Sequence, residues 1–394
     1  MTRPSPAILT LAGVVFVDIL GLAIIIPSLP YVVRDFGAGG LQLGLILTAY
    51  SLAQAVAAPV LGRLSDRYGR RPVLLLALAG SAVSLALAGL AESVPALVVA
   101  RCVAGLCGGS IGVAYAFAAD LTPPAGRTAA MSWIGTGVGL AFTVGPAAGA
   151  VLAPRGFAAV CAVAAAIVAA NLVAAWFVLP RSAAPGGVAT ASGRGPRWPR
   201  PGWAVTVLVL AGGVTTLSFV SMETTIALLT DDRFGFGATQ IGWLLAAAGA
   251  AMTAVQLGVA AGLAARWPDH AVAVAACALG AVSLAVVPLA ARAGTVAAVL
   301  VLSAAYGVLG VVLMSLVSQA GPMSAVGARV GAAQSANAAG RAIGPLAAGA
   351  LYDVRAGSPY ALTAGLLAAV AALLALRRRP SRTADGPRTG RPGA

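Results

Sequence analysis

Long apolar runs, repeated along the whole chain, constrain its fold more strongly than any other feature. Residues 8–33, 73–92 and 157–180 are three of them, and each is long enough as a helix to cross the ~30 Å hydrocarbon core of a bilayer. Hydrocarbon offers the backbone no hydrogen-bond partners, so such runs must be helical. Since 60% of the 394 residues are hydrophobic and only 9% are charged, the composition predicts an all-α integral membrane protein.

Charge-poor runs predict twelve transmembrane helices in total. We expect them near residues 8–33, 41–62, 73–92, 95–119, 128–152, 157–180, 203–230, 238–262, 271–291, 295–319, 330–352 and 358–376. Residues 181–202 are rich in Pro, Gly, Ser and Arg, which indicates a cytoplasmic linker between an N-terminal half, 1–180, and a C-terminal half, 203–376. The basic tail, 377–394, is rich in Pro and Gly, and we expect it to be disordered.

The arginines indicate how the chain is oriented. All 25 basic residues are arginine, and with twelve spans most of them lie on one side of the membrane. The opposite side would hold only Arg34, Arg155, Arg233, Arg292 and Arg355. Because basic loops stay in the cytoplasm, we expect both termini there, and the Arg-, Ala- and Gly-rich composition suggests a bacterial plasma (inner) membrane. The formal charge of +14 then reflects topology and contact with anionic lipids, not nucleic-acid binding.

A charged segment between the second and third apolar runs is the most specific motif. Residues 62–75 read G-R-L-S-D-R-Y-G-R-R-P-V-L-L. The order G-x-L-x-D-R-x-G-R-R resembles the signature loop between spans 2 and 3 of the major facilitator superfamily of secondary transporters. A solvated basic loop is the alternative, but it would not need glycine and aspartate at these spacings. The resemblance implies a gating loop that consists of Gly62, Asp66, Arg67, Gly69, Arg70 and Arg71.

Two short motifs recur about half a chain apart. The F-G-x-G-x-x-Q-x-G pattern of residues 36–44 returns at 234–242, and the Gly-Pro pair at 145–146 returns at 344–345. The two separations are almost equal, so chance similarity in a Gly-rich chain is a poor explanation. Parallel repeats of this kind are typical of facilitator transporters, in which two pseudo-symmetric six-helix bundles hold the substrate between them.

Four ionisable residues lie within the expected spans: Asp18, Arg101, Glu223 and Arg341. A charge at the centre of a transmembrane helix costs ~2.5 kcal/mol or more and usually faces a cavity and a partner. Asp18 lies ~15 Å deep, near the midplane. Burial favours a neutral acid and a nearby arginine favours the carboxylate, so Asp18 can load and release a proton as a cavity opens and closes. A structural ion pair and a permanently neutral acid are the alternatives.

The partners of the other three charges stay open. Spans 1 and 4 both line the first-half cavity in facilitator proteins, so the resemblance implies that Arg101 can reach Asp18, with either a gating or a structural role. Glu223 either faces the cavity or reaches the outer interface. Arg341 lies too deep to extend easily to the membrane surface, and it can pair with Glu223 or with substrate.

Glycines in the fifth span indicate a class of transporter. The pattern that contains Gly139, Gly145, Pro146 and Gly149 resembles the motif typical of facilitator antiporters, as opposed to symporters. Such glycines let helices approach closely, and a proline bends the span. Ordinary packing of small residues is the alternative.

Nearly the whole chain resembles the twelve-span drug:proton antiporters, and its first span is similar to that of the tetracycline exporters. Those exporters carry further acids in spans 3 and 9, where this chain has Ser84 and, in residues 271–291, no acid. We therefore expect a monomeric proton-coupled antiporter that exports a small amphipathic drug, antibiotic or secondary metabolite other than tetracycline. The alternatives are a facilitator or symporter of a sugar or other small metabolite, and a membrane receptor or scaffold without transport.

No arrangement of residues for catalysis is present, so we do not expect an enzyme. His270 is the only histidine, and no phosphate-binding loop or nucleophile motif occurs. The four cysteines lie in apolar runs without metal-ligand spacing, and we expect neither a metal nor another cofactor. The expected partners are a small-molecule substrate, protons and membrane lipids.

Overall fold

The computed structural model describes residues 5–123, 126–180, 203–256, 266–321 and 326–376. These ranges are helical with short connections and contain no strand, which confirms the predicted all-α fold. Ten helical stretches within them are long and apolar enough to cross a membrane. The linker expected at 181–202 and the tail expected at 377–394 lie outside the described residues.

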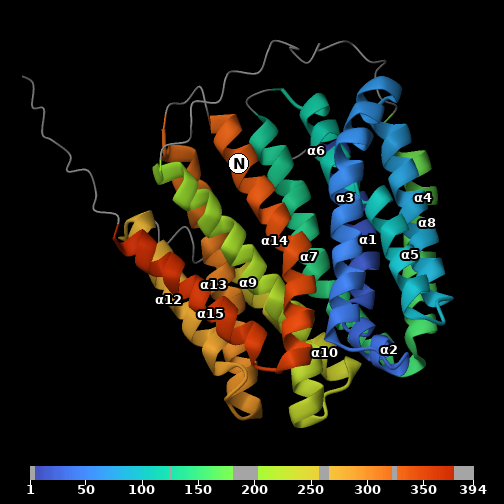
Figure 1. Ribbon diagram of the computed structural model, residues 1–394. Helices are drawn as coiled ribbons and strands as arrows, with labels where there is room; N and C mark the ends of the chain where they lie inside the picture. The colour runs from blue at the N-terminus through green and yellow to red at the C-terminus, as the bar shows by residue number, and fades with distance from the viewer. Residues whose placement is uncertain (1–4, 124–125, 181–202, 257–265, 322–325, 377–394) are drawn as a thin grey trace, which may run out of the picture.

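The first half of the chain forms one bundle. Its helices are α1 (Pro6–Ile25), α2 (Leu29–Asp35), α3 (Gly40–Tyr68), α4 (Arg70–Gly89), α5 (Val94–Cys107), α6 (Ser110–Leu121), α7 (Arg127–Leu152), the short 3-10 helix η2 (Ala153–Arg155) and α8 (Phe157–Val178). Figure 1 shows this bundle, in blue to green, on the right.

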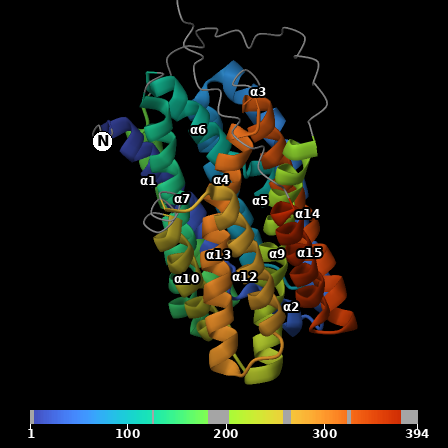
Figure 2. The same ribbon diagram turned by 90° about the vertical axis from the view of Figure 1, so that its left-hand side faces the viewer.

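The second half forms a bundle beside it, in yellow-green to red (Figure 1). Its helices are α9 (Trp203–Phe234), α10 (Ala238–Ala254), α12 (Asp269–Val286), α13 (Arg292–Gln319), α14 (Val326–Val354) and α15 (Ser358–Ala375). The helices of both bundles run roughly along one direction in both views (Figures 1 and 2). We call the end at which α3 meets α4 the arginine end, and the opposite end, which carries α2, the α2 end.

Two predicted spans are each broken into two helices. The span expected at 8–33 is interrupted between α1 and α2, because Pro27 and Pro30 cannot donate to the helical ladder. The span expected at 95–119 is interrupted at Gly108 and Gly109, between α5 and α6. The Nε2 group of Gln54 donates to the carbonyl of Gly108 at 2.7 Å, so a side chain satisfies the backbone at this break.

The expected gating loop is mostly helical, which corrects the prediction of a connecting loop over residues 62–75. Helix α3 continues through Asp66 and Arg67 to Tyr68, and α4 begins at Arg70. Gly69 alone separates them, with a φ of +94° that side chains rarely adopt. The turn itself therefore requires Gly69, and the arginines of the motif lie at the ends of the two helices.

The two copies of the F-G-x-G-x-x-Q-x-G repeat fold alike. Gly37 and Gly235 have φ values of +71° and +64°, which turn the chain before α3 and α10. The amides of Gly39 and Gly237 each donate to the side-chain oxygen of the glutamine three residues later, at 3.0 Å in both copies. Each pattern therefore encodes the start of a helix.

The last glycine of each repeat explains how the bundles meet. A Cβ atom on Gly44 of α3 would lie 2.3 Å from the carbonyl oxygen of Pro345 on α14. A Cβ atom on Gly242 of α10 would lie 2.7 Å from the carbonyl oxygen of Pro146 on α7. Each half therefore contributes a glycine and a proline to two equivalent contacts between the halves, and these repeated residues lie at the interface.

Substitution of Gly44 by alanine should destabilise the protein by about 1–3 kcal/mol, because the added methyl group overpacks this contact. Gly365→Ala on α15 is the matched control, since a Cβ atom there meets nothing within 4 Å. We expect a lower melting temperature for Gly44→Ala and an unchanged or slightly higher one for Gly365→Ala, measured on purified protein in detergent. Equal melting temperatures would show that the halves do not depend on this contact.

Candidate functional site

Two adjoining cavities lie between the bundles. The central cavity has a volume of about 170 Å³, and its walls include Arg101, Glu223, Arg341 and apolar side chains of both halves. The second, which we call the end cavity, has a volume of about 620 Å³ and extends along α3, α6 and α14 to Asp66 at the arginine end. Ser51 and Arg341 line both cavities, so the two spaces meet at these residues.

Three of the four charges predicted within the spans face the central cavity. Arg101 projects from α5 and is 5% exposed, Glu223 projects from α9, and Arg341 projects from α14. No ion pair joins any two of them in the described part of the chain. The Nε atom of Arg101 is buried without a hydrogen-bond partner. The pairing of Glu223 with Arg341, one of the two alternatives that the sequence left open, therefore does not occur in this conformation.

Asp18 lies in a separate small pocket beside the central cavity. The Oγ group of Ser110 donates to Oδ2 of Asp18 at 2.6 Å, while Oδ1 is buried and has no partner. Ser81 and Ser84 complete the polar wall of the pocket. Ser110 is the first residue of α6, so the break between α5 and α6 brings its hydroxyl to the carboxylate.

Arg101 is not the ion-pair partner that the sequence suggested for Asp18. No ion pair joins them within the described ranges, and Ser110 takes the expected place of the arginine. Tyr50 of α3 lines both the Asp18 pocket and the central cavity, whose wall also contains Arg101. Gly108 lines both the Asp18 pocket and the end cavity. Asp18 is thus close to both cavities without being part of either wall.

Charged residues of the 62–75 motif crosslink the first bundle. Arg70 forms ion pairs with Asp66 at 2.5 Å and with Asp120 of α6 at 2.9 Å, and it donates to Ser65 at 2.7 Å. These contacts tie α3, α4 and α6 together at the arginine end. Asp66 also lines the end cavity, opposite α14 of the second bundle.

The other residues of this motif have different surroundings. The guanidinium groups of Arg67 and Arg71 lie over the rings of Tyr68 and Trp176, with 5.4 and 5.8 Å to the ring centroids. Arg71 also donates to the backbone carbonyl of Trp176 on α8. Gly62 lines the end cavity, and a Cβ atom there would meet nothing within 4 Å.

The glycines of the expected antiporter motif fix α7 against α1. A Cβ atom on Gly145 would lie 2.3 Å from Cβ of Ala23, and one on Gly149 would lie 2.3 Å from the carbonyl oxygen of Ile24. A Cβ atom on Gly139, by contrast, would meet nothing closer than Oγ1 of Thr253, at 3.9 Å. Together with the contact between Pro146 and Gly242, this packing makes α7 the link between α1 and the second bundle.

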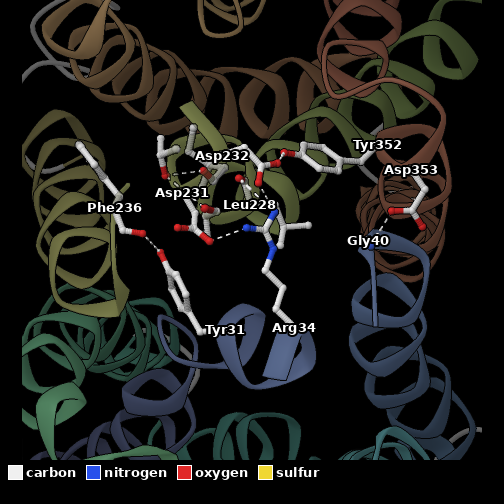
Figure 3. A network of polar contacts seen from close by, with 12 residues as sticks. Tyr31, Arg34, Gly40, Leu228, Asp231, Asp232, Phe236, Tyr352 and Asp353 are labelled. Atoms are coloured by element: carbon white, nitrogen blue, oxygen red, sulfur yellow. Dashed lines mark hydrogen bonds and ion pairs between the residues drawn. The ribbon is translucent and has the colours of Figure 1, made fainter. Parts of the chain in front are cut away.

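An ionic network that sequence patterns did not predict joins the bundles at the α2 end (Figure 3). Arg34 of α2 forms ion pairs with Asp231 and, at 2.7 Å, with Asp232 of α9. The hydroxyl of Tyr352 on α14 donates to Asp232 at 2.6 Å. Next to it, the hydroxyl of Tyr31 donates to the carbonyl of Phe236 at 2.7 Å.

A carboxylate closes the same end between α3 and α14. Asp353 accepts hydrogen bonds from the backbone amides of Gly40 at 2.7 Å and Leu41 at 2.8 Å (Figure 3). These amides begin α3 and have no helical partners of their own, and the helix dipole also favours an anion there. The α2 end is thus crosslinked between the bundles, whereas the end cavity separates them toward the arginine end.

Comparison with known proteins identifies a family profile that matches most of the chain and relatives that match parts of it. The profile of the Major Facilitator Superfamily matches residues 11–345 and 208–393. The tetracycline resistance protein, class C, of Escherichia coli is 29% identical over 265 residues, which are 63% of this chain and 64% of that protein. The class E protein of Escherichia coli is 40% identical over 139 residues, 34% of each chain. The aligned part thus covers less than two thirds of the length of these curated relatives.

A solved structure resembles the chain more completely. The crystal structure of the human organic anion transporter MFSD10 (TETRAN) has a TM-score of 0.69 at 25% identity, and the match covers 94% of this chain and 100% of that one. The family match and the likeness to this transporter confirm the prediction that the chain is not an enzyme.

Replacing Arg34 by glutamine should loosen the α2 end. The ion pairs of Arg34 are partly exposed and together contribute roughly 1 kcal/mol, so the separated state of this end should become about fivefold more populated. Arg155→Gln is the control, because Arg155 lies in η2 outside the network. Hydrogen–deuterium exchange of α2 and of residues 236–240 should rise in Arg34→Gln alone. Similar exchange in both variants would mean that the network does not hold this end together.

Proposed function

Because this chain belongs to the Major Facilitator Superfamily, we propose that it is a proton-coupled antiporter that exports a small amphipathic molecule by alternating access. The observation that carries the proposal is Asp18, a carboxylate buried midway along α1 with one oxygen unpartnered, next to cavities between the two bundles. Similarity to tetracycline resistance proteins supports export of a drug-like molecule. Ser84 in the Asp18 pocket supports a substrate different from that of the tetracycline exporters.

Orientation follows from the arginines. We assign the arginine end to the cytoplasm of a bacterial plasma membrane, since basic segments are retained there. The crosslinked α2 end then faces outward, and the end cavity leads from the cytoplasm to the central cavity. In this reading the structure represents an inward-facing conformation, ready to receive substrate from the cytoplasm.

Alternation requires that the two ends close in turn. The contacts of Gly44 with Pro345 and of Gly242 with Pro146 lie about one helical turn inside α3 and α10, on the side of the α2 end. They can serve as pivots when the arginine end closes, because they involve backbone atoms and no long side chains. When the α2 end opens, the ion pairs of Arg34 must break. Asp66 is the matching latch at the arginine end: its carboxylate faces the end cavity and would be stabilised beside the N-terminus of α14 when the bundles close.

Proton exchange is assigned to Asp18. Burial favours the neutral acid, and the hydrogen bond from Ser110 favours the carboxylate, so a cavity that opens or closes beside Asp18 can shift the balance between the two forms. In the outward-facing state a proton enters and substrate leaves; in the inward-facing state the proton leaves past Gly108 into the end cavity. Tyr50 lies between Asp18 and the central cavity, so the proton and the substrate bind at different places. They compete because each of them favours a different conformation of the protein.

Asp18→Asn should abolish uphill transport, because an asparagine cannot release a proton. Exchange of substrate down its own gradient should survive, since it needs no net proton movement. The measurement is uptake into inverted vesicles with an imposed pH gradient, with a fluorescent amphipathic dye as reporter. Asp35→Asn is the control, because Asp35 is an exposed acid of α2 outside the pocket. If Asp18→Asn still concentrates the dye like the native protein, the proton site lies elsewhere, and Glu223 is the next acid to test.

A further inference from the structure

The central cavity contains more positive than negative charge. Arg101 and Arg341 both line it, and Glu223 is the only acidic residue among its described lining residues. The cavity is enclosed by apolar side chains such as Leu43, Phe142 and Val220, which do not compensate the excess charge.

Neither arginine has a carboxylate partner in the described part of the chain. Arg101 lies on the cavity wall and is only 5% exposed, and its Nε atom has no hydrogen-bond partner. Arg341 forms no ion pair either, although Glu223 lines the same cavity. Charged groups within a membrane are costly and are normally paired, so two guanidinium groups around one space indicate that an anion enters it.

We propose that the central cavity binds an organic anion, with its acidic group between Arg101 and Arg341 and its apolar body against Leu43, Phe142 and Val220. A guanidinium group presents paired donors that match a carboxylate, sulfonate or phosphonate. This inference rests on the proposed transport function and names the chemical class of its substrate.

The positions of the two arginines give the anion a further role. Arg101 belongs to α5 of the first bundle, and Arg341 belongs to α14 of the second. An anion between them joins the bundles at the centre of the molecule, and it is released when a conformational change separates α5 from α14. An anion that leaves the cytoplasm also moves down the inside-negative membrane potential, so the potential favours its export.

Matched sets of small aromatic compounds test the proposal directly. Each set has one body, naphthalene, biphenyl or indole, and carries a carboxylate, a carboxamide or an aminomethyl group. Binding to the purified full-length protein is measured by titration calorimetry. We expect at least one carboxylate to bind tenfold or more tightly than its amide and its amine. If no carboxylate is preferred, the proposal is wrong.

Variants then locate the anion. Arg341→Gln should lose tenfold or more in carboxylate affinity, and Arg341→Lys should recover part of it because the charge is kept. Arg101→Gln should lose carboxylate affinity as Arg341→Gln does. Because Arg341 is exposed to the cavity, its variants stay informative even if removal of the buried Arg101 impairs folding. Arg355→Gln, on an exposed arginine outside the cavity, is the control. Unchanged carboxylate binding in Arg341→Gln would overturn the proposal.

The same compounds separate this inference from proton-coupled antiport. If a carboxylate binds in an arginine-dependent manner but a pH gradient does not drive its uptake into inverted vesicles, the anion site stands and proton coupling fails. If the pH gradient drives uptake of an amine beyond that into vesicles without the protein, and Arg341→Gln does not change this uptake, antiport stands and the anion site fails.

Discussion

Two contacts between glycine and proline backbones determine how the rest of the molecule is arranged. Gly44 meets Pro345 and Gly242 meets Pro146, each closely enough that no side chain fits between them. They set α3 against α14 and α7 against α10, and the cavities lie between these helix pairs. Since the same residues recur in both halves of the sequence, a duplicated pattern produces an interface with approximate twofold symmetry. In the proposed cycle, the bundles rock about these contacts.

The charges on this symmetric framework are not symmetric. The first bundle holds Asp18 in its serine pocket and the Asp66–Arg70–Asp120 cluster, whereas the second supplies Glu223 and Arg341 to the central cavity. The α2 end is joined by ion pairs across the bundles, whereas the ion pairs described at the arginine end lie within the first bundle. A symmetric interface with asymmetric charge can favour one conformation over the other, and protonation or substrate binding can then reverse the preference.

Sequence patterns predicted the helices well because the bilayer permits few alternatives to a long apolar helix. The repeat and the 62–75 motif were also visible, since they depend on local backbone geometry such as the positive φ of Gly69. The partner of Asp18 was not predictable: Ser110 is an ordinary residue that a break in the fourth span brings into place. Arg34 was interpreted only as one of the outer-loop arginines, because its partners Asp231 and Asp232 lie in the other half of the chain.

The central claim is that the two ends of the molecule open reciprocally around fixed contacts and that Asp18 controls the balance. Double electron–electron resonance can measure both ends in one preparation series, with spin labels at Tyr68 and Trp267 across the arginine end and at Leu90 and Leu289 across the α2 end, all exposed positions. Compared with the native protein, Asp18→Asn should show a shorter distance across the arginine end and a longer distance across the α2 end. The same fraction of molecules should change at both ends. Changes in the same direction at both ends, or at one end alone, would contradict this claim.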